Sequence, residues 1–397
     1  MTGRKMNRWL LPEGIEEALP DDAAWLEAYR RRLVDLYRSW GYEFVMPPFI
    51  EYLESLLAGA SEDLDLQTFK LTDQLTGRLM GVRADMTPQI ARIDAHRINR
   101  DGPVRLCYLG TVLTTRPAGF GGTRSPLQVG VELYGHEGID SDREVLSLLL
   151  ETMAVCGVEG VNVDLGHTGI FREVSQAAGL DDTQASELFD MLQRKSVPEI
   201  DAFAAQLDVA DAVAVGIRQL PLLNGGVETL AHAREVLAFA PRAMASIDAL
   251  DALAREVGLR YPDVAIHFDL AELSGYHYET GVVFSAYTSG EGQEIARGGR
   301  YHGIGKDFGR ERPAIGFSAD LKMLRKVSSA TFSDTSRRIL APCNVSDTVL
   351  NQMISTLRSQ GDCVVYVLDS QGEPQELSGC SHQLIKRDDQ WVVEEIR

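Results

Sequence analysis

The sequence predicts an α+β fold in which an antiparallel sheet is flanked by helices, with a helical insertion and a small C-terminal α/β unit. Three observations predict it. Segments with strand-like alternation or β-branched clusters fall on both sides of residues 167–260. Those intervening residues are rich in Ala and Leu at helical spacing and contain scarcely any strand-forming run. The tail from residue 336 has its own succession of strand and helix patterns.

The length and composition indicate a globular protein of two or three domains. With 397 residues, of which 44% are hydrophobic, the chain can bury a sizeable core. The segment VSSATFSDTSRR, which begins at Val327, is rich in Ser and Thr and poor in apolar residues, so it is the best domain boundary. We predict a core of residues 1–326, with an insertion at about 167–260, and a small domain of residues 336–397.

The charge balance and the cysteines narrow the class of function. Lys and Arg number 39 against 58 Asp and Glu, and the resulting net charge of −19 disfavours nucleic acid as a partner. The five cysteines contain no CxxC pair, which argues against a zinc site or a disulfide framework. No apolar run is long enough for a membrane span or a signal peptide. We expect a cytoplasmic protein with no metal, cofactor, nucleic acid or membrane partner.

The first elements are a helix and a short strand. Apolar residues recur at helical spacing through residues 25–37, with Asp21 or Asp22 placed to cap the helix and Gly41 to end it. Residues 42–48 then read as a strand that runs into two consecutive prolines. Because proline cannot donate to a central ladder, this strand should lie at an edge or an interface.

A hairpin and a second helix come next. Residues 67–83 have a hairpin-like pattern with turn residues in the middle. The sequence RADMTPQIARIDAHRI then predicts a helix over about 88–99, capped near Thr87 and with Pro88 at its first position.

The next two strands carry polar residues on one face. Residues 103–112 and 126–135 face each other across a glycine-rich loop. Because side chains alternate along a strand, Gln128, Gly130 and Glu132 share a face while the intervening apolar residues can face a core. An amide and a carboxylate would then flank bare backbone at Gly130, which indicates a site for a small polar ligand.

The remaining elements complete the two predicted units. A helix over 141–157 and a strand over 161–165 precede the insertion, and strand patterns return at 265–273, 278–288 and 292–299. In the tail, the pattern predicts a strand from about 337, a helix over 346–361, and strands at 363–369, 382–387 and 391–396.

Three motifs occur in a fixed order along the predicted core: RADMT at 83–87, QVGVELYG at 128–135 and ARGGRYHG at 296–303. Together they resemble the core of class II aminoacyl-tRNA synthetases, and the histidyl-tRNA synthetase branch in particular. The resemblance extends from about Leu11 to Leu324. It implies an antiparallel sheet of the class II synthetase kind, and dimerisation through the FVMPPF segment at 44–49.

The resemblance also implies a histidine-like pocket. Its residues here are Asp85, Thr87, Gln128, Glu132, Tyr278, Gly299 and Tyr301. In that family the first three hold the amino group of histidine, and Glu132 with one of the two tyrosines faces the imidazole. The chemistry suits these residue types, since a carboxylate accepts charge-assisted hydrogen bonds from an ammonium or an imidazole. Gly298 and Gly299 would let the backbone approach a ligand closely.

The arginines that class II synthetases use on ATP are replaced. The position after the motif 2 strand falls on Thr114, the motif 3 position on Met323, and the histidine-specific position on Ser274. Arg116 and Lys322 lie near two of these positions, but a guanidinium fork and an ammonium are not interchangeable at a phosphate. Losing one preorganised cation can cost roughly 3 kcal/mol of transition-state stabilisation. We therefore expect no catalytic residue.

A synthetase-like body without these arginines resembles the regulatory subunits of ATP phosphoribosyltransferase. The tail is shorter than a tRNA-binding domain and has more acidic than basic residues, which also argues against tRNA binding. The resemblance implies a non-catalytic subunit of histidine biosynthesis, whose core dimerises within a hetero-oligomer. Its partner would be a short catalytic subunit that joins phosphoribosyl pyrophosphate to ATP, with histidine as a possible ligand and feedback signal.

Two other functions are compatible with this sequence, and several of its motifs have ordinary structural explanations. An active histidyl-tRNA synthetase-like ligase with displaced arginines, or a free-standing amino-acid sensor, would account for the same pocket. GGRYHGIGKD lacks the spacing of a P-loop. His96, His136 and His167 have no ligand-like spacing and are predicted to be structural. His277 either touches a ligand or forms a hydrogen bond within the sheet.

Overall fold

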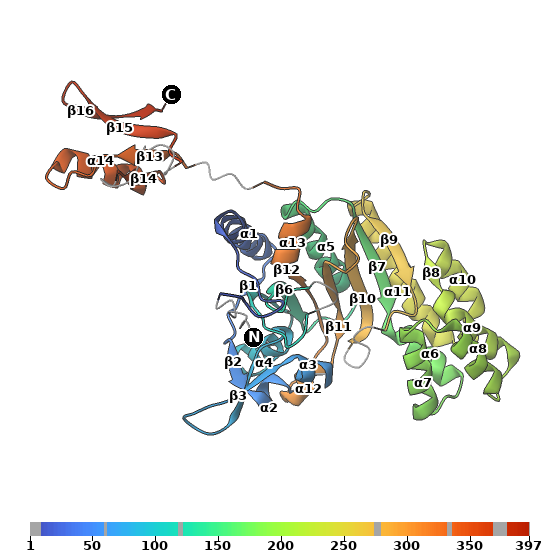
Figure 1. Cartoon of the computed structure of the whole chain (residues 1–397). Coiled ribbons are helices and arrows are strands. Elements are labelled where there is room, and N and C mark those ends of the chain that lie inside the picture. The colour runs from blue at the N-terminus through green and yellow to red at the C-terminus, as the bar shows by residue number, and fades with distance from the viewer. Residues whose placement is uncertain are drawn as a thin grey trace, which may run out of the picture. The chain divides into compact units, whose positions relative to one another are not determined.

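The computed structural model describes residues 9–58, 62–117, 122–273, 279–331, 336–367 and 379–396. The chain forms two compact units, residues 1–331 and 332–397 (Figure 1). The larger unit is a mixed sheet with helices packed against it, and the described residues of the smaller unit form a four-stranded sheet with one helix. The predicted α+β class is confirmed.

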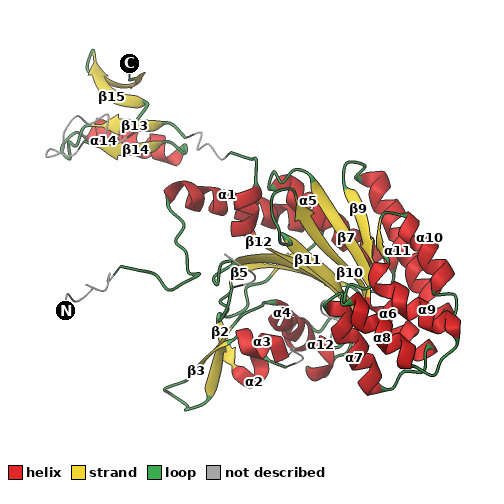
Figure 2. Ribbon diagram, turned by 45° about the vertical axis from the view of Figure 1, so that its right-hand side comes forward, coloured by secondary structure: helices red, strands yellow, loops and turns green. Residues whose placement is uncertain are grey.

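A nine-stranded sheet forms the centre of the larger unit (Figure 2). Its strands are β1 (Glu43–Phe44), β5 (Val104–Thr111), β6 (Leu127–Tyr134), β7 (Val161–His167), β8 (Asn224–Gly225), β9 (Ala265–Asp269), β10 (Glu279–Thr288), β11 (Ala296–Tyr301) and β12 (Ala314–Asp320). Their order is β1-β5-β6-β12-β11-β10-β7-β9-β8. Neighbours from β5 across to β7 are antiparallel, whereas β1 and β9 join in parallel. The proline-ended strand β1 lies at the edge, as predicted.

One face of this sheet is covered by helices. On β6, Val129, Val131 and Leu133 are buried in a core shared with helices α1 (Pro20–Ser39), α5 (Ile139–Val155) and α11 (Pro241–Arg260). Gln128 and Glu132 contact groups on the opposite face, as the alternation predicted. We call that opposite face the site face.

Helix α1 begins one residue before its acidic pair. Leu19 is its N-cap and makes no side-chain cap, Pro20 occupies the first helical position, and Asp21 and Asp22 lie in the first turn. The prediction that one of these aspartates caps the helix is therefore wrong. Proline suits the first position because it needs no hydrogen bond there, and the carboxylates instead complement the helix dipole. Gly41 follows the helix with a φ of 85°, as expected for its end.

A separate three-stranded sheet, ordered β2-β4-β3, precedes the site residues. It comprises β2 (Ile50–Tyr52), β3 (Phe69–Thr72) and β4 (Leu79–Val82), and its helices are α2 (Leu53–Leu56) and α3 (Glu62–Gln67). The pairing of β3 with β4 is the predicted hairpin. Helix α4 (Thr87–Ile93) follows and continues as a π-helical turn, Asp94–Ile98, so the predicted helix is present with a widened last turn. Its N-cap is Met86, which makes no side-chain cap, so Thr87 is the first helical residue and Pro88 the second, one position later than predicted.

Residues 168–260 are mainly helical. The helices are α6 (Thr168–Ala177), α7 (Asp182–Gln193), α8 (Val197–Gln206), α9 (Asp211–Gln219), α10 (Glu228–Val236) and α11. The two-residue strand β8 interrupts them and pairs with β9 at the sheet edge. Three elements that follow the insertion were not predicted as such: β12, α12 (Ile304–Asp307) and α13 (Leu321–Val327).

Over 336–367 and 379–396, the smaller unit is a sheet ordered β14-β13-β15-β16 with one helix. Its elements are β13 (Arg338–Ala341), α14 (Thr348–Ser359), β14 (Cys363–Tyr366), β15 (His382–Arg387) and β16 (Gln390–Glu395). Leu350, Ile354 and Leu357 of α14 pack with Ile339 and Val364 of the sheet. The predicted strand over 363–369 ends at Tyr366, and its last two residues lie outside the described part.

Candidate functional site

The site face is built where four antiparallel strands run side by side. Their register sets Glu132 of β6 opposite Gly316 of β12, and Gly316 opposite Gly299 of β11. Gly299 in turn pairs with Val283 of β10. Two adjacent strands therefore place glycines beside the Glu132 carboxylate. Because glycine has no side chain, the groups that contact this carboxylate come from other segments.

Glu132 is the most enclosed acidic group of this face, with 1% of the residue exposed. Three hydroxyls donate to its carboxylate: Thr87 Oγ1 at 2.9 Å, Tyr108 Oη at 3.2 Å and Tyr301 Oη at 2.7 Å. The Tyr301 hydroxyl also lies 3.2 Å from that of Tyr134. Burial raises the pKa of Glu132 to about 8, because the three hydroxyls only partly offset the loss of solvent.

The other three polar candidates meet beside Glu132. The Gln128 amide donates to Asp85 Oδ1 at 2.7 Å, and its oxygen accepts from the Met86 amide at 3.0 Å. The Thr87 amide also donates to Asp85 Oδ1, at 3.2 Å. Asp85, Thr87 and Gln128 are half-buried, in contrast with Glu132. They form the accessible rim of a site whose enclosed end is Glu132.

The expectation of bare backbone at Gly130 is wrong. A side chain at Gly130 would place its Cβ 2.5 Å from Tyr108 Oη and 2.4 Å from the Phe317 carbonyl oxygen. Tyr108 on β5 pairs directly with Gly130, so the tyrosine fills the space that the glycine leaves. At Gly316, a Cβ would lie 1.9 Å from Glu132 Oε2. These glycines accommodate side chains of the protein itself.

Gly299 also makes room for a side chain. A Cβ there would lie 2.8 Å from Oε1 of Glu279. Glu279 was not among the predicted site residues, although its carboxylate reaches the same face. Tyr278, the predicted alternative to Tyr301 at the imidazole, lies outside the described residues, as does His277. Of the two tyrosines, Tyr301 is the one whose contact with Glu132 is described.

Of the three positions at which the resemblance led us to expect a synthetase arginine, two are described. Thr114 Oγ1 donates to the Arg116 carbonyl at 2.7 Å, and Met323 packs against the helix-covered core. Ser274 lies outside the described residues. Lys322, the neighbour of Met323, donates to the carbonyl of Ser125 at 2.8 Å.

Two nearby arginines are also held by backbone carbonyls. Arg83 is buried and donates through Nε to Thr111 at 2.9 Å and through Nη1 to Pro47 at 2.8 Å. Arg124 donates through Nε to Thr114 at 3.1 Å and through Nη1 to Glu13 at 3.2 Å. These hydrogen bonds tie both guanidinium groups to backbone of the segments around the site.

The family models match two segments of the chain. Residues 14–324 match the family described as histidyl-tRNA synthetase, and residues 336–394 match the C-terminal domain of the ATP phosphoribosyltransferase subunit HisZ. An ATP phosphoribosyltransferase regulatory subunit from Thioalkalivibrio sulfidiphilus is 56% identical over 98% of this chain and 99% of its own. The chain belongs to the family of ATP phosphoribosyltransferase regulatory subunits. One from Alkalilimnicola ehrlichii is 50% identical over 97% of this chain and 96% of its own.

Solved structures of related proteins are similar to this chain. An ATP phosphoribosyltransferase regulatory subunit/histidyl-tRNA synthetase from Bacillus halodurans has a TM-score of 0.81 at 26% identity, covering 94% of this chain and 96% of that one. A histidyl-tRNA synthetase from Nostoc has a TM-score of 0.75 at 17% identity, covering 98% and 97%, and supports the fold alone. The resemblance to a histidyl-tRNA synthetase-like regulatory subunit and the class II sheet are confirmed.

The predicted structural histidines have ordinary partners in this regulatory subunit. His96 packs edge-on against Phe308, His136 lies 2.9 Å from Ser141 Oγ, and His167 accepts from the Gly169 amide at the start of α6. Within the described ranges, no cluster of three or more His, Cys, Asp or Glu is arranged to hold a metal ion. Among the described helices, none is both long and apolar enough to cross a bilayer.

Proposed function

We propose that this chain is a non-catalytic subunit that assembles in the cytoplasm with a short catalytic subunit of ATP phosphoribosyltransferase. Together they would carry out the first step of histidine biosynthesis. The family supports the regulatory role. The observation that supports the absence of catalysis is that Arg83, Arg124 and Lys322 donate to backbone carbonyls of neighbouring segments.

The physical reason is the charge that develops in adenylate formation. Negative charge on the α-phosphate needs preorganised cations, and each missing donor costs roughly 3 kcal/mol. Thr114 and Met323 supply none, and freeing Arg83 would leave the carbonyls of Pro47 and Thr111 without these donors. The site therefore keeps groups that accept hydrogen bonds from an amine but offers little to a triphosphate.

We further propose that the pocket binds L-histidine as a feedback signal. Asp85, Thr87 and Gln128 would take its amino group, and Glu132 with Tyr301 its imidazole. Gly299 and Tyr278 are the remaining proposed lining positions. The convergence of Asp85 with Gln128 and of Thr87 with Glu132 supports this assignment. A ligand imidazole would need to replace hydroxyl donors now on Glu132, so we expect local rearrangement on binding.

Reconstitution with a short catalytic subunit tests the proposed role. We expect the mixture to condense ATP with phosphoribosyl pyrophosphate at least about tenfold faster than the catalytic subunit alone, a coupling of about 1.4 kcal/mol. The chain alone should give no histidine-dependent exchange of pyrophosphate into ATP. Calorimetry should show histidine binding that Asp85→Asn weakens about tenfold, because a charge-assisted bond is lost.

The outcomes separate the alternatives. Asp35→Asn, on the exposed side of α1, is the matched control and should leave histidine binding unchanged. Pyrophosphate exchange by the chain alone would show an active ligase. Histidine binding without any effect on, or association with, the catalytic subunit would show a free-standing sensor. Absence of binding at millimolar histidine would rule out the proposed ligand but not the regulatory role.

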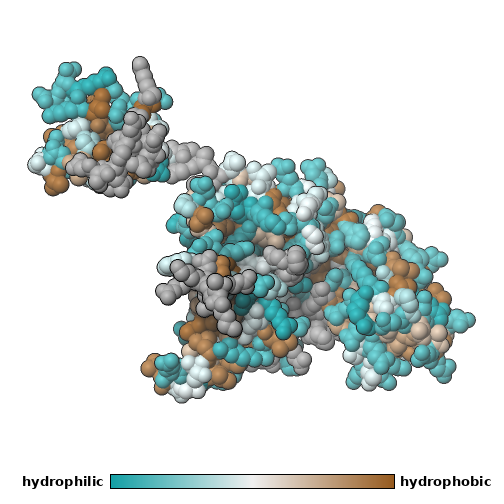
Figure 3. Space-filling view, viewed as in Figure 1, coloured by the Kyte–Doolittle hydropathy of each residue, from teal (hydrophilic) through white to brown (hydrophobic). Residues whose placement is uncertain are grey.

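We also propose that a second copy of the chain packs against the β2-β4-β3 sheet. One face of this sheet consists of Ile50, Tyr52, Phe69, Leu71, Met80 and Val82. Figure 3 shows hydrophobic side chains gathered over β2 and β3. Phe49, Ile50 and Met46 are 45%, 42% and 79% exposed and flank the prolines of the FVMPPF segment. A contiguous apolar face of this kind marks a protein interface.

A charged residue in this face should separate the dimer. We expect Ile50→Glu to halve the molar mass measured by light scattering at micromolar concentration, because a carboxylate would be buried in the interface. Leu259→Lys, at an exposed position of α11, is the control and should leave the mass unchanged. A monomeric parent chain, or a dimer that survives Ile50→Glu, would contradict this assignment.

A further inference from the structure

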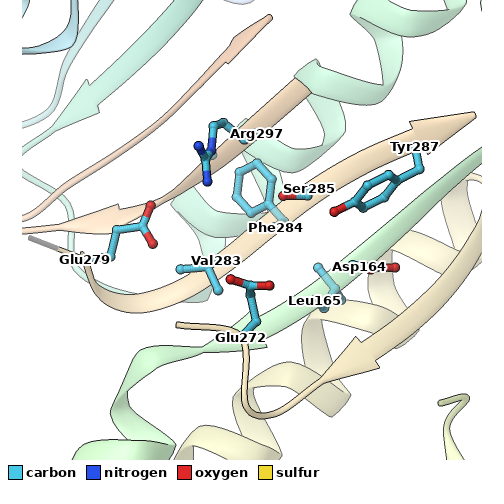
Figure 4. Close-up of a pocket in the computed structure, with 10 residues that line it drawn as sticks. Asp164, Leu165, Glu272, Glu279, Val283, Phe284, Ser285, Tyr287 and Arg297 are labelled. Atoms are coloured by element: carbon cyan, nitrogen blue, oxygen red, sulfur yellow. The ribbon is translucent and has the colours of Figure 1, made fainter. Parts of the chain in front are cut away.

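A second polar cleft lies on the site face, over β10 and its neighbours β11 and β7. Its lining includes the carboxyl groups of Asp164, Glu272 and Glu279, the guanidinium of Arg297 and the hydroxyl of Tyr287. In Figure 4 the two glutamates lie on either side of Val283, with Arg297 across from them. The cavity of about 20 Å³ has room for one water-sized group.

The local backbone places both glutamates over β10. The register of β10 and β11 shifts between Glu279 and Val283, and because these residues are four apart on β10 they keep the same face of the sheet. Gly299 then allows the Glu279 carboxylate to lie against β11, since any Cβ there would clash with it. On the other side, a Cβ at Gly166 would lie 3.0 Å from Glu272 Cβ. The cleft thus depends on two glycines and this register shift.

Glu279 stands out within the cleft. Its Oε2 atom is buried and accepts no hydrogen bond from any residue that the structure describes. A buried polar atom without a partner costs free energy, and most such atoms in folded proteins have one. Burial raises the pKa of Glu279 to about 8, and Arg297 offsets this only in part while Glu272 and Glu294 add to it.

The surrounding charges favour a cation in this cleft. Arg297 forms an ion pair with Glu294 at 3.2 Å, so its charge is shared with a second carboxylate. Glu294 also accepts from Ser285 Oγ at 2.9 Å. Asp164 at the far end faces His267 at 3.4 Å. Acidic groups outnumber basic ones around the cleft, so a bound phosphate or carboxylate would be repelled.

We propose that this cleft is a subsite for one protonated nitrogen group of a small ligand, with Glu279 as its hydrogen-bond acceptor. The ammonium would occupy the small space beside Val283 and donate to Oε2, and Glu272 would contribute charge. Two strands, β12 and β11, separate Glu279 on β10 from Glu132 on β6, the carboxylate that the resemblance assigned to a ligand. The inference needs neither the catalytic partner nor histidine itself.

Nuclear magnetic resonance of the full chain with ¹³C-labelled glutamate carboxyls tests the subsite. The Glu279 resonance, identified by its loss in Glu279→Gln, should titrate with a pKa near 8. Adding methylammonium chloride should lower that pKa by about one unit or more, because the cation stabilises the carboxylate. Sodium chloride at equal ionic strength should not.

Two controls make the result decisive. Glu187→Gln, at an exposed position of α7, should leave the Glu279 titration and its response to methylammonium intact. The Glu132 resonance, identified in Glu132→Gln, reports whether the cation also acts at the first carboxylate. A Glu279 pKa near 8 that ignores methylammonium would overturn the subsite, and so would a pKa near the ordinary value. Failure of histidine binding or of reconstitution would leave this test unaffected.

Discussion

The free energy of unfolding of the isolated chain should fall by about 4 kcal/mol between pH 6.5 and 8.5. Glu132 and Glu279 each have a pKa raised from 4.5 to about 8 by burial. In this window the folded chain binds more protons than the unfolded chain, so stability decreases as the pH rises. Each carboxyl contributes about 2 kcal/mol over this window, since one pKa unit corresponds to about 1.4 kcal/mol.

Glu132 and Glu279 dominate the slope in this window, because His167 and His302, whose pKa values are lowered, act mainly below it. Burial lowers the pKa of His167 to about 4, which makes stability rise with pH below 6.5 and would mask the trend there. Urea titrations at several pH values would measure the slope. Glu132→Gln with Glu279→Gln should flatten it, each change alone should halve it, and Glu187→Gln should retain it. A flat profile in the parent chain would mean that both carboxylates are ionised at neutral pH.

Strand alternation predicted the site face correctly but not what fills it. Gln128 and Glu132 share a face because side chains alternate along a strand with a period of two residues. Their spacing in the sequence is therefore enough to predict this. The role of Gly130 depended on which residue stands opposite it. Tyr108 does so because β5 and β6 pair in one particular register. The two strand segments can be aligned in this register from their sequences, and that alignment places Tyr108 opposite Gly130.

Glu279 was missed for another reason. It lies four residues before Val283, so alternation places both on the site face, but the sequence does not show that the register shift brings its carboxylate against Gly299. Asp21 and Asp22 illustrate a smaller failure, in which an acidic pair suits both a cap and a first turn. Pro20 decides between these positions, because proline fits the first helical residue. Where the same residues suit both a cap and a first turn, the position at which the whole helix begins decides between them.

Replacing Arg300 with methionine should destabilise the larger unit by about 3 to 5 kcal/mol, the usual effect of removing one member of a buried ion pair. Arg300 is buried on β11 and donates through Nε to Asp142 Oδ1 at 2.9 Å. Its other nitrogens donate to the carbonyls of His136 and Gly138, each at 3.0 Å, and to Ser141 Oγ at 2.7 Å. These acceptors would lose their donor together.

Denaturant unfolding of Arg300→Met, Asp142→Leu and the double variant would measure the pair. The double variant should recover part of the loss, because it removes the unpaired charge of Asp142, whose pKa burial raises, but leaves the carbonyls of His136 and Gly138 without the Arg300 donor. A loss below about 1 kcal/mol in Arg300→Met would show that the pair is effectively solvated. The position of Arg300 also matters for the site. Arg300 belongs to the GGRY motif yet contacts α5, away from the site face, so it anchors the strand that carries Gly299 and Tyr301 and is not available to a ligand on that face.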